Sequence, residues 1–281
     1  MTHAEQHRRE GPTLEDRAPA RTGRGRRFAR HGAHRVSAAP SDPFGEARVS
    51  VVIPTLNEAA NLPHVFARLP QGLHEVVVVD GRSVDDTVAV AKALRPDVRI
   101  VLEKRHGKGI ALAAGFAAAT GDIIVMLDAD GSTDPAEIPR YVFALLEGAD
   151  FAKGSRFMPG GATDDITPIR RLGNSALNGT VNVLYGTRYT DLCYGYNAFW
   201  NHCLPVLDLG DDHGFEIETV INVRIARAGL HVVEVPSVER ERIFGESKLS
   251  PVRDGLRVLR TIVRERGRPA RQSQPTLVEE G

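Results

Sequence analysis

Ile123 to Leu127 form a run of five apolar residues without alternation, which is the pattern of a strand buried on both faces of a parallel sheet. Asp128 and Asp130 follow directly, so the strand delivers two carboxylates at its C-terminal end. Open α/β sheets bind ligands at that end. Two acids one residue apart on an irregular turn can reach one divalent cation, and Mg²⁺ or Mn²⁺ with oxygen ligands suits a diphosphate. Acids also cap helices and fill turns, so the metal site is a hypothesis that the rest of the chain must support.

Three more segments upstream have the character of buried strands. They are rich in β-branched residues, helical segments separate them, and they cover residues 48–53, 75–79 and 98–102. Such alternation, with right-handed crossovers, makes neighbouring strands parallel. The expected fold class is therefore α/β, with a mainly parallel, twisted sheet flanked by helices.

Polar residues follow these strands at the ends that meet along one edge of a parallel sheet. They are Asp80, Asp128 and Asp130, the loop 54–58 and the segment 103–105. Strand termination alone places one or two polar residues at such an edge, but it accounts less readily for all of them. Their convergence indicates a nucleotide site, with places for a base, a ribose and metal-bound phosphates.

The charge and the cysteine content limit the classes of protein to which the chain can belong. The 281 residues include 36 basic and 36 acidic side chains, so the overall charge gives no reason to expect a nucleic acid partner. Two cysteines, Cys193 and Cys203, are too few for a disulfide framework or a zinc site. No apolar run reaches the roughly 18 residues that span a bilayer, and the N-terminus lacks the apolar core of a signal peptide. We therefore expect a cytoplasmic protein.

Composition also divides the chain. Residues 1–47 hold nine arginines and six acids but almost no aliphatic side chains, which predicts a disordered basic tail, either simply solvated or in contact with anionic lipid or a partner. Residues 48–250 are expected to form the folded domain, and 267–281 a second disordered tail.

The segment 251–266 is expected to be an amphipathic helix with two stripes. The apolar stripe holds Val252, Leu256, Leu259 and Val263, and the stripe one residue on holds Arg253, Arg257, Arg260 and Arg264. This pattern suits a helix that docks on the domain or one that lies on the cytoplasmic face of a membrane. Two loops upstream are also of interest: 158–165 is expected to be a mobile lid, and 239–249 is either a charged loop that closes on an anionic ligand or a solvated charge run.

Over residues 49 to 262 the chain resembles the family 2 glycosyltransferases of the GT-A fold, and within them most closely the polyprenyl (dolichyl) phosphate mannose synthase type. The resemblance rests on five motifs, which are Val52-Ile53-Pro54-Thr55-Leu56-Asn57-Glu58, Val79-Asp80-Gly81-Arg82-Ser83-Val84-Asp85-Asp86-Thr87, Leu127-Asp128-Ala129-Asp130, Gly154-Ser155-Arg156-Phe157 and Phe244-Gly245-Glu246-Ser247-Lys248-Leu249. The first three place the chain in the wider family. The last points to the lipid-phosphate branch.

This resemblance implies a metal-dependent, inverting transferase that moves a hexose, mannose or glucose, from GDP-mannose or UDP-glucose to polyprenyl phosphate. The nucleotide would be held by Pro54, Leu56, Glu58, Val79, Asp80, Asp128 and Ala129, and Mg²⁺ or Mn²⁺ by Asp128 and Asp130. Three cations would face the donor diphosphate and the acceptor phosphate, namely Arg156, Arg242 and Lys248. Peripheral membrane contact or a membrane partner protein would bring the enzyme to its lipid.

An acceptor phosphate is already an ionised nucleophile, so this branch needs no dedicated general base, whereas a hydroxyl acceptor would. For a hydroxyl acceptor on a polysaccharide, a glycolipid or a small molecule, the candidate bases are Asp191, Glu216 and Glu218. A third alternative is a noncatalytic subunit that binds a nucleotide sugar.

The chain departs from the family pattern at three places. Asp80-Gly81-Arg82-Ser83 stands where Asp-Asp-Gly-Ser is common, which leaves the donor base open. Ser132 stands where the mannose synthases often have Gln, and Asn197 where relatives frequently have Arg. The Ser132 departure leaves the metal shell and the sugar open.

Overall fold

The structure is a computed structural model, and it describes residues 43–210, 214, 216–245 and 250–268. The predictions for the basic tail up to residue 42, for Lys248 and for residues 269–281 lie outside the described residues. The predicted domain boundaries stay predictions.

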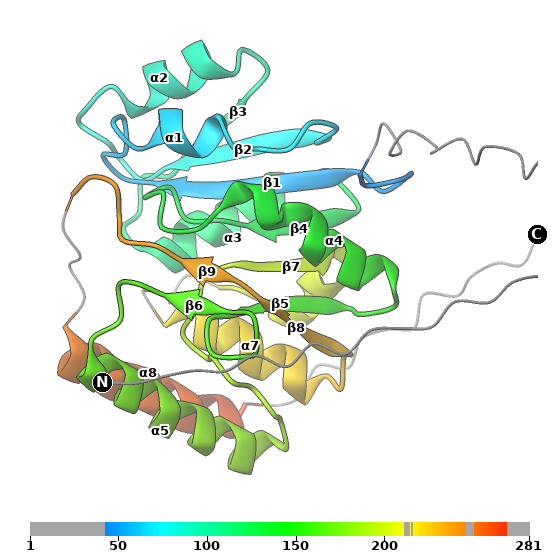
Figure 1. Cartoon of the computed structure of the whole chain (residues 1–281), viewed down its shortest axis with the longest axis vertical. Helices are drawn as coiled ribbons and strands as arrows, with labels where there is room; N and C mark the ends of the chain where they lie inside the picture. Colours follow the sequence, from blue (N-terminus) through cyan, green and yellow to red (C-terminus); the bar gives the residue numbers. More distant parts are fainter. Residues whose placement is uncertain (1–42, 211–213, 215, 246–249, 269–281) are drawn as a thin grey trace, which may run out of the picture. The chain divides into compact units, whose positions relative to one another are not determined.

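A seven-stranded sheet forms the centre of the described part, in the order β3-β2-β1-β4-β7-β5-β8 (Figure 1). Its strands are β1 (Val49–Thr55), β2 (Glu75–Asp80), β3 (Arg99–Leu102), β4 (Ile123–Met126), β5 (Phe151–Ser155), β7 (Asn197–Trp200) and β8 (Val232–Pro236). Only β7 runs against its neighbours β4 and β5; the pairs β1–β2, β2–β3, β1–β4 and β5–β8 are parallel. The predicted α/β class with a mainly parallel sheet is confirmed.

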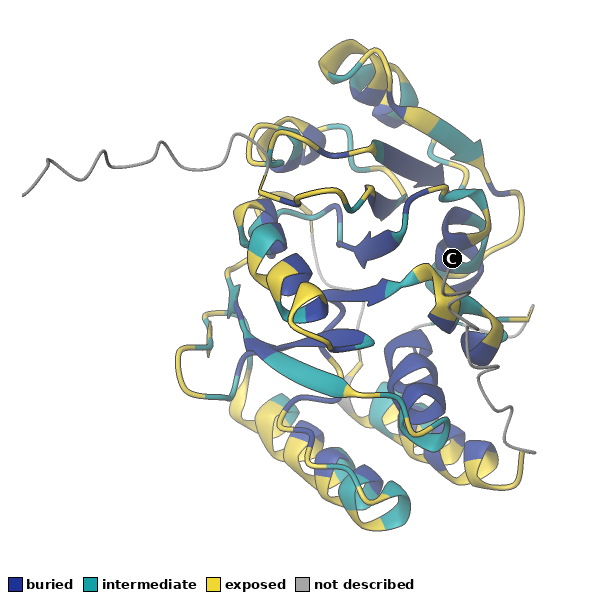
Figure 2. Ribbon diagram, turned by 90° about the vertical axis from the view of Figure 1, so that its right-hand side faces the viewer, coloured by how far each residue is buried: buried dark blue, intermediate teal, exposed yellow. Residues whose placement is uncertain are grey.

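Helices cover both faces of this sheet because its strands are apolar on both sides. Along β1, Val51 and Ile53 point to one core and Val52 to the other, the two-residue period of a strand. The first core is closed by α1 (Leu62–Phe66), α2 (Thr87–Leu94) and α4 (Ile138–Leu146), which follows the 3₁₀ turn Pro135–Glu137. The second core is closed by α3 (Lys108–Ala118), α6 (Leu204–Leu207), which follows the 3₁₀ turn Asn201–Cys203, and α7 (Ile217–Arg227). Figure 2 shows the central strands largely buried and the helices exposed on their outer sides.

Two long helices, α5 (Pro168–Tyr185) and α8 (Pro251–Arg266), pack against each other and against α7. A third apolar cluster joins them, with Val181 from α5, Val223 from α7 and Ile262 from α8. The buried Arg224 of α7 bonds Glu265 of α8 through two nitrogens, at 2.9 and 3.0 Å. The predicted C-terminal helix therefore docks on the domain, but through a different face from the predicted apolar stripe, whose four residues are all exposed.

Two short pieces of sheet were not predicted from the sequence. β7 overlaps the end of segment 191–199, in which polar and aromatic residues are mixed and the strand pattern is not recognisable. β6 (Ala162–Thr163) pairs with β9 (Val238–Glu239), so the segment expected to be a mobile lid is tied to the chain after β8. Within the described ranges, no helix has the length and apolar character needed to cross a bilayer.

Candidate active site

The Asp128-Ala129-Asp130 turn lies where the strand order reverses. The chain places β2 and β3 on one side of β1 and then crosses to place β4 on the other side. At such a reversal the loops after two neighbouring strands separate and leave room for a ligand. The turn after β4 and the loop after β1 therefore flank the point that sequence reasoning selected.

Lys108 holds the first carboxylate of this turn. Its ammonium lies 2.7 Å from Asp128 Oδ1, 2.9 Å from Asp128 Oδ2 and 2.7 Å from Glu218 Oε1. Burial disfavours the charge of Lys108, but the two carboxylates outweigh it and hold the pKa of the ammonium above its ordinary value. Burial raises the pKa of Glu218. The first residue of α3 and the first turn of α7 thus meet at the Asp128 carboxylate.

Gly195 completes this group of side chains from the segment before β7. A Cβ at this position would lie 3.2 Å from Asp128 Oδ2, Glu218 Oε1 and Lys108 Nζ. A distance of 3.2 Å is closer than most Cβ contacts, and here the Cβ would make three of them at once. Glycine at position 195 therefore lets the backbone approach the cluster.

Arg242 holds the second carboxylate. Its guanidinium lies 2.9 Å from Asp130 Oδ2 and 3.6 Å from Glu58 Oε1. The other Asp130 oxygen accepts hydrogen bonds from the backbone N–H of Ser132 at 3.0 Å and from its hydroxyl at 2.7 Å. Burial raises the pKa of Glu58, against the effects of Asn61 and Arg242. Ser132, noted from sequence only as a departure, therefore shapes the acidic turn.

The segment that carries Arg242 packs over this turn. Ile243 N–H donates to the Asp130 carbonyl at 3.2 Å, and the Asn61 side chain bonds both the N–H and the carbonyl of Phe244, at 3.0 and 3.2 Å. Gly131 has a φ of +76°, and a Cβ there would lie 2.5 Å from Ile243 Cδ1. The described part of the segment 239–249 is therefore in contact with the acidic turn.

The charges of this site fit a divalent cation. Four carboxylates, from Glu58, Asp128, Asp130 and Glu218, meet two cations, Lys108 and Arg242, which leaves two formal negative charges in excess. Among the described residues, no group of three or more His, Cys, Asp or Glu is arranged to hold a metal by itself. Mg²⁺ typically takes one or two carboxylates and completes its shell with water and substrate phosphates. Asp128 and Asp130 fit that chemistry.

The loops after β1 and β2 lie beside the turn. Pro54 and Val79 pair in register between these strands, Leu56 is exposed, and Asp80 accepts backbone hydrogen bonds from Arg82 and Ser83. Arg82 has a φ of +73°, in the left-handed region that favours glycine. The Arg82 guanidinium bonds the His106 ring at 2.7 Å. The structure thus brings the residues predicted to bind the nucleotide to one edge of the sheet.

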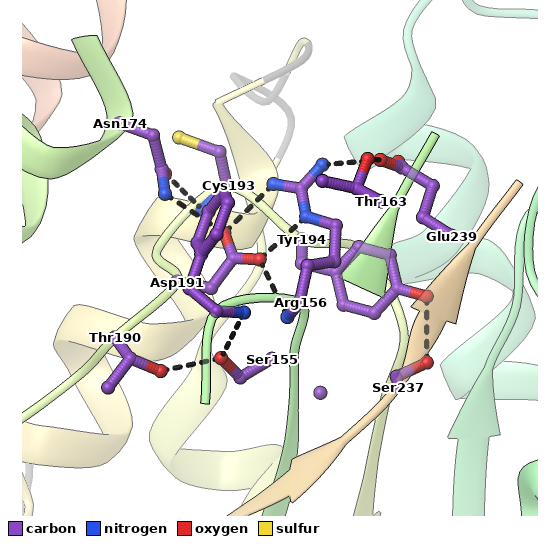
Figure 3. Close-up of polar contacts among 12 residues, drawn as sticks. Ser155, Arg156, Thr163, Asn174, Thr190, Asp191, Cys193, Tyr194, Ser237 and Glu239 are labelled. Atoms are coloured by element: carbon purple, nitrogen blue, oxygen red, sulfur yellow. Dashed lines mark hydrogen bonds and ion pairs between the residues drawn. The ribbon is translucent and has the colours of Figure 1, made fainter. Parts of the chain in front are cut away.

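Arg156 lies in a second ionic cluster, shown in Figure 3. Its guanidinium donates to the two Asp191 oxygens at 2.6 and 2.9 Å and to Glu239 Oε2 at 2.8 Å. The Tyr194 ring packs 4.9 Å from the guanidinium carbon, and Asn174 donates to Asp191 at 3.2 Å. Burial raises the pKa of the Asp191 carboxyl, but Arg156 outweighs it and the net pKa is lowered. The prediction that Arg156 faces the diphosphate stays a prediction.

Sequence reasoning gave other members of the site little weight. In the sequence, Gly107-Lys108-Gly109 is compatible with an anion contact by Lys108 or with a solvent-facing turn, and Glu218 is a candidate base; neither Asn61 nor Gly195 belongs to a motif that points to the site. Asp191 is fully buried against Arg156, and Glu218 is bound to Lys108. Glu216 is buried at the start of α7, and its Oε2 has no hydrogen-bond partner among the described residues. The Gly107-Lys108-Gly109 sequence was the one available signal for a lysine held close to the sheet.

Comparison with known proteins adds a family match. Residues 50–201 match the family model described as "Glycosyl transferase family 2". The chain is 38% identical over 216 residues to the polyprenol monophosphomannose synthase of Mycolicibacterium smegmatis, covering 72% of this chain and 81% of the relative. It is 35% identical to the undecaprenyl-phosphate mannosyltransferase of Micrococcus luteus, covering 72% and 88%.

Among solved structures, the chain is similar to glucosyl-3-phosphoglycerate synthase from Mycobacterium tuberculosis in complex with Mn²⁺, uridine diphosphate and glucosyl-3-phosphoglycerate. The TM-score is 0.61 at 25% identity, and the match covers 81% of this chain and 82% of that chain. The fold shared with this neighbour is the GT-A fold.

Proposed function

Because the chain belongs to glycosyl transferase family 2, and is therefore a glycosyltransferase, we propose that it transfers a hexose from a nucleoside diphosphate sugar to a polyprenyl phosphate. The observation that carries the proposal is the acidic turn at the reversal of strand order, with two negative charges in excess. The names of the two mannose-transferring relatives support mannose as the sugar and a lipid phosphate as the acceptor.

The donor would lie along the sheet edge, with its base and ribose at the loops after β1 and β2 and its diphosphate at Asp128 and Asp130. When bound there, Mg²⁺ or Mn²⁺ supplies positive charge that stabilises the leaving nucleoside diphosphate. The similarity to a structure that contains Mn²⁺ and uridine diphosphate supports this use of the two acids. Lys108 keeps the Asp128 carboxylate in place, because it is bonded to both of its oxygens.

In the transfer step, an oxygen of the acceptor phosphate bonds to C1 of the sugar as the bond from C1 to the diphosphate oxygen breaks. A single displacement of this kind inverts the anomeric centre. The acceptor phosphate needs no base because it is ionised at neutral pH. Two of the three candidate bases for a hydroxyl acceptor are engaged, Asp191 by Arg156 and Glu218 by Lys108. The third, Glu216, has no hydrogen-bond partner for its Oε2 among the described residues.

Arg242 would face the two anionic substrates. It is about one third exposed and its segment packs on the acidic turn, so it lies beside the place proposed for the diphosphate. Arg156 is proposed to support this region through its position, because its guanidinium bonds Asp191 and Glu239 and so joins the end of β5 to β9, the strand that leads to Arg242. Lys248 keeps its predicted role as a phosphate-facing cation, outside the described residues.

A panel of donors and acceptors tests the function. Purified protein with Mn²⁺ or Mg²⁺ is offered GDP-mannose or UDP-glucose, with either a polyprenyl phosphate or a hydroxyl acceptor such as phosphoglycerate. We expect a glycosylated lipid phosphate from at least one donor, loss of product with excess chelator, and inversion at C1 by NMR. Transfer to hydroxyl acceptors alone would establish the alternative that the glucosyl-3-phosphoglycerate neighbour supports. Donor binding without turnover on any acceptor would contradict both.

A further inference from the structure

The outer sides of α5 and α8 are unpartnered in the described part of the chain. These two helices lie side by side at the lower end of the view in Figure 1 and bury their inner faces against α7. Tyr185 of α5 donates a hydrogen bond to the Ile262 carbonyl of α8 at 2.5 Å, and Glu265 fixes α8 to Arg224 of α7. Because the inner faces are fastened in this way, the outer faces point away from the domain. We refer to these two outer faces together as the α5–α8 face.

Beyond Arg170 and Arg171 in its first turn, the α5 part of this face is uncharged and carries exposed apolar side chains. Leu172 is 73% exposed and Val183 is 84% exposed, and Ile169 is also exposed. Residues 172–187 contain no Asp, Glu, Lys, Arg or His. A surface helix of a soluble domain normally carries charged residues opposite its buried face, and α5 does not over this range.

The α8 part combines apolar side chains with arginines. Its exposed apolar residues are Val252, Leu256, Leu259 and Val263, with exposed fractions from 38% to 66%. Three of the arginines on the neighbouring stripe are exposed as well, namely Arg253, Arg260 and Arg264. Of fifteen large apolar side chains exposed among the described residues, seven belong to α5 and α8. Exposed apolar side chains are therefore concentrated on these two helices, which is the sign of an interaction surface.

We propose that the α5–α8 face docks the enzyme on an anionic lipid bilayer. The apolar side chains would enter the boundary between headgroups and acyl chains, while the arginines extend to lipid phosphates. The inference rests on the proposed function in one respect: a polyprenyl phosphate resides in a membrane, so the transferase must reach the bilayer surface.

Charge favours a bilayer over a second copy of the chain. The two helices carry seven arginines and two acids, and both acids are engaged: Asp254 accepts from Ser250 N–H at 2.7 Å, and Glu265 is paired with Arg224. A two-fold contact between identical faces would bring arginines toward arginines, which is unfavourable. Anionic headgroups supply the complementary charge.

The position of the face suits access to the acceptor. Figure 1 shows that both helices begin on the side of the molecule toward which β1 runs, and the acidic turn follows β4, which is parallel to β1. Ile243 and Phe244, in the segment that packs over this turn, are exposed as well. Docking through the α5–α8 face would therefore hold the site near the membrane surface, where the phosphate of a polyprenyl phosphate lies.

Vesicle flotation tests the docking. The vesicles are phosphatidylcholine alone or with about one third phosphatidylglycerol, at low and high salt. We expect binding to the anionic vesicles that weakens with salt. The variants are Leu172→Gln with Val183→Gln, Leu256→Gln with Val263→Gln, and a triple Arg→Gln change at Arg253, Arg260 and Arg264. The matched controls are Val84→Gln and Phe143→Gln, which alter exposed apolar residues outside the α5–α8 face.

Each apolar pair should weaken vesicle binding by about tenfold or more. The triple arginine variant should lose about fivefold per arginine, and only with anionic vesicles. The controls should bind as the unaltered protein does, and thermal melting should show all variants folded. Equal binding by variants and controls, or absence of binding by the unaltered protein, would overturn the proposal. So would light scattering that shows a dimer lost in the variants while vesicle binding is unchanged.

Activity separates this proposal from the proposed function. With a short-chain, water-soluble polyprenyl phosphate the face variants should keep the activity of the unaltered protein, and with a long-chain acceptor in vesicles they should lose it. Vesicle binding without transfer to any polyprenyl phosphate would remove the proposed acceptor and leave the docking surface intact. Equal loss with both acceptors would show that the variants damage the site and would overturn the docking interpretation.

Discussion

Two ionic clusters in this molecule use the same residue types in different ways. Around Arg156, three guanidinium N–H groups meet two carboxylates, both Asp191 oxygens are bonded, and an aromatic ring packs on the cation. At the acidic turn, Arg242 is about one third exposed and the carboxylates outnumber the cations by two. The Arg156 cluster is closed and the acidic turn can accept more positive charge.

The difference shows which cluster can exchange partners. A buried pair with every group bonded is costly to separate, because each charge would remain without solvent or partner. A partly exposed pair with an excess of one sign can replace its protein cation by an ionic ligand at small cost. On this basis the Arg156 cluster fixes the position of β9 and the acidic turn binds the ligand. The predictions below test this comparison, from the largest expected effect to the smallest.

Breaking the closed cluster should have the largest effect on folding. Asp191→Asn leaves the Arg156 charge without its main partner, and we expect the free energy of unfolding to fall by about 3 to 5 kcal/mol, measured by urea denaturation. Arg48→Met is the control, because it breaks the exposed pair with Asp122 and should cost about 0 to 1 kcal/mol. Similar losses in the two variants would show that the Arg156 cluster is not the structural element inferred above.

Asp130→Asn should have the opposite profile. Removing one charge from a cluster with excess negative charge should change the free energy of unfolding by less than about 1 kcal/mol. Transfer activity should fall by about 10² to 10³, since the change removes electrostatic stabilisation of the leaving diphosphate. Titration with Mn²⁺, followed by electron paramagnetic resonance, should show weaker binding. A variant that unfolds like Asp191→Asn would contradict the distinction between the clusters.

Arg242→Met should lower activity by about 10 to 10², because it removes a cation from beside the anionic substrates. Arg242→Lys keeps the charge and should restore part of that loss. Thermal melting should differ little among the three proteins, since Arg242 is partly exposed. If Arg242→Met is fully active, the segment that packs over the acidic turn has only a structural role.

The smallest effects should appear in the dependence of the free energy of unfolding on pH, where Asp191 and Glu58 should contribute slopes of opposite sign. The lowered pKa of Asp191 contributes stability above the ordinary aspartate pKa of about 3.9, and this contribution is lost as pH falls through the folded-state value. The raised pKa of Glu58 means that the folded state holds the proton more tightly, so stability falls as pH rises above about 4.3 through the raised value. Urea midpoints across this range should lose the first slope in Asp191→Asn and the second in Glu58→Gln. Unchanged slopes would refute the assignments.

Much of the fold was predictable because apolar residues recur with clear periods. The strands up to β4 and the helix α8 were expected close to their observed bounds. The Asp128 and Asp130 turn was predicted because a buried strand leads into it. β7 and the pair β6–β9 were missed, since their residues are mixed or their strands have only two residues.

The partners of the site residues were harder to predict. Lys108, Glu218 and Gly195 come from three separate segments, and no local pattern links them to Asp128. The face by which α8 docks was also not predictable: the sequence pattern gave a regular apolar stripe, but the domain contacts Val258 and Ile262 instead. Both depend on which segments become neighbours after folding.

By itself the sequence determined the alternation of strands and helices, the family and the two acids after β4, because each depends on residues close together in the chain. Only the tertiary structure decided which cation pairs with which acid, and which side of α8 is left exposed. Ion pairing and burial depend on distances between segments that can be more than a hundred residues apart in the chain, as Lys108 and Glu218 are. The Asp128-Ala129-Asp130 turn is fixed locally, and its charge balance is set by the packing around it.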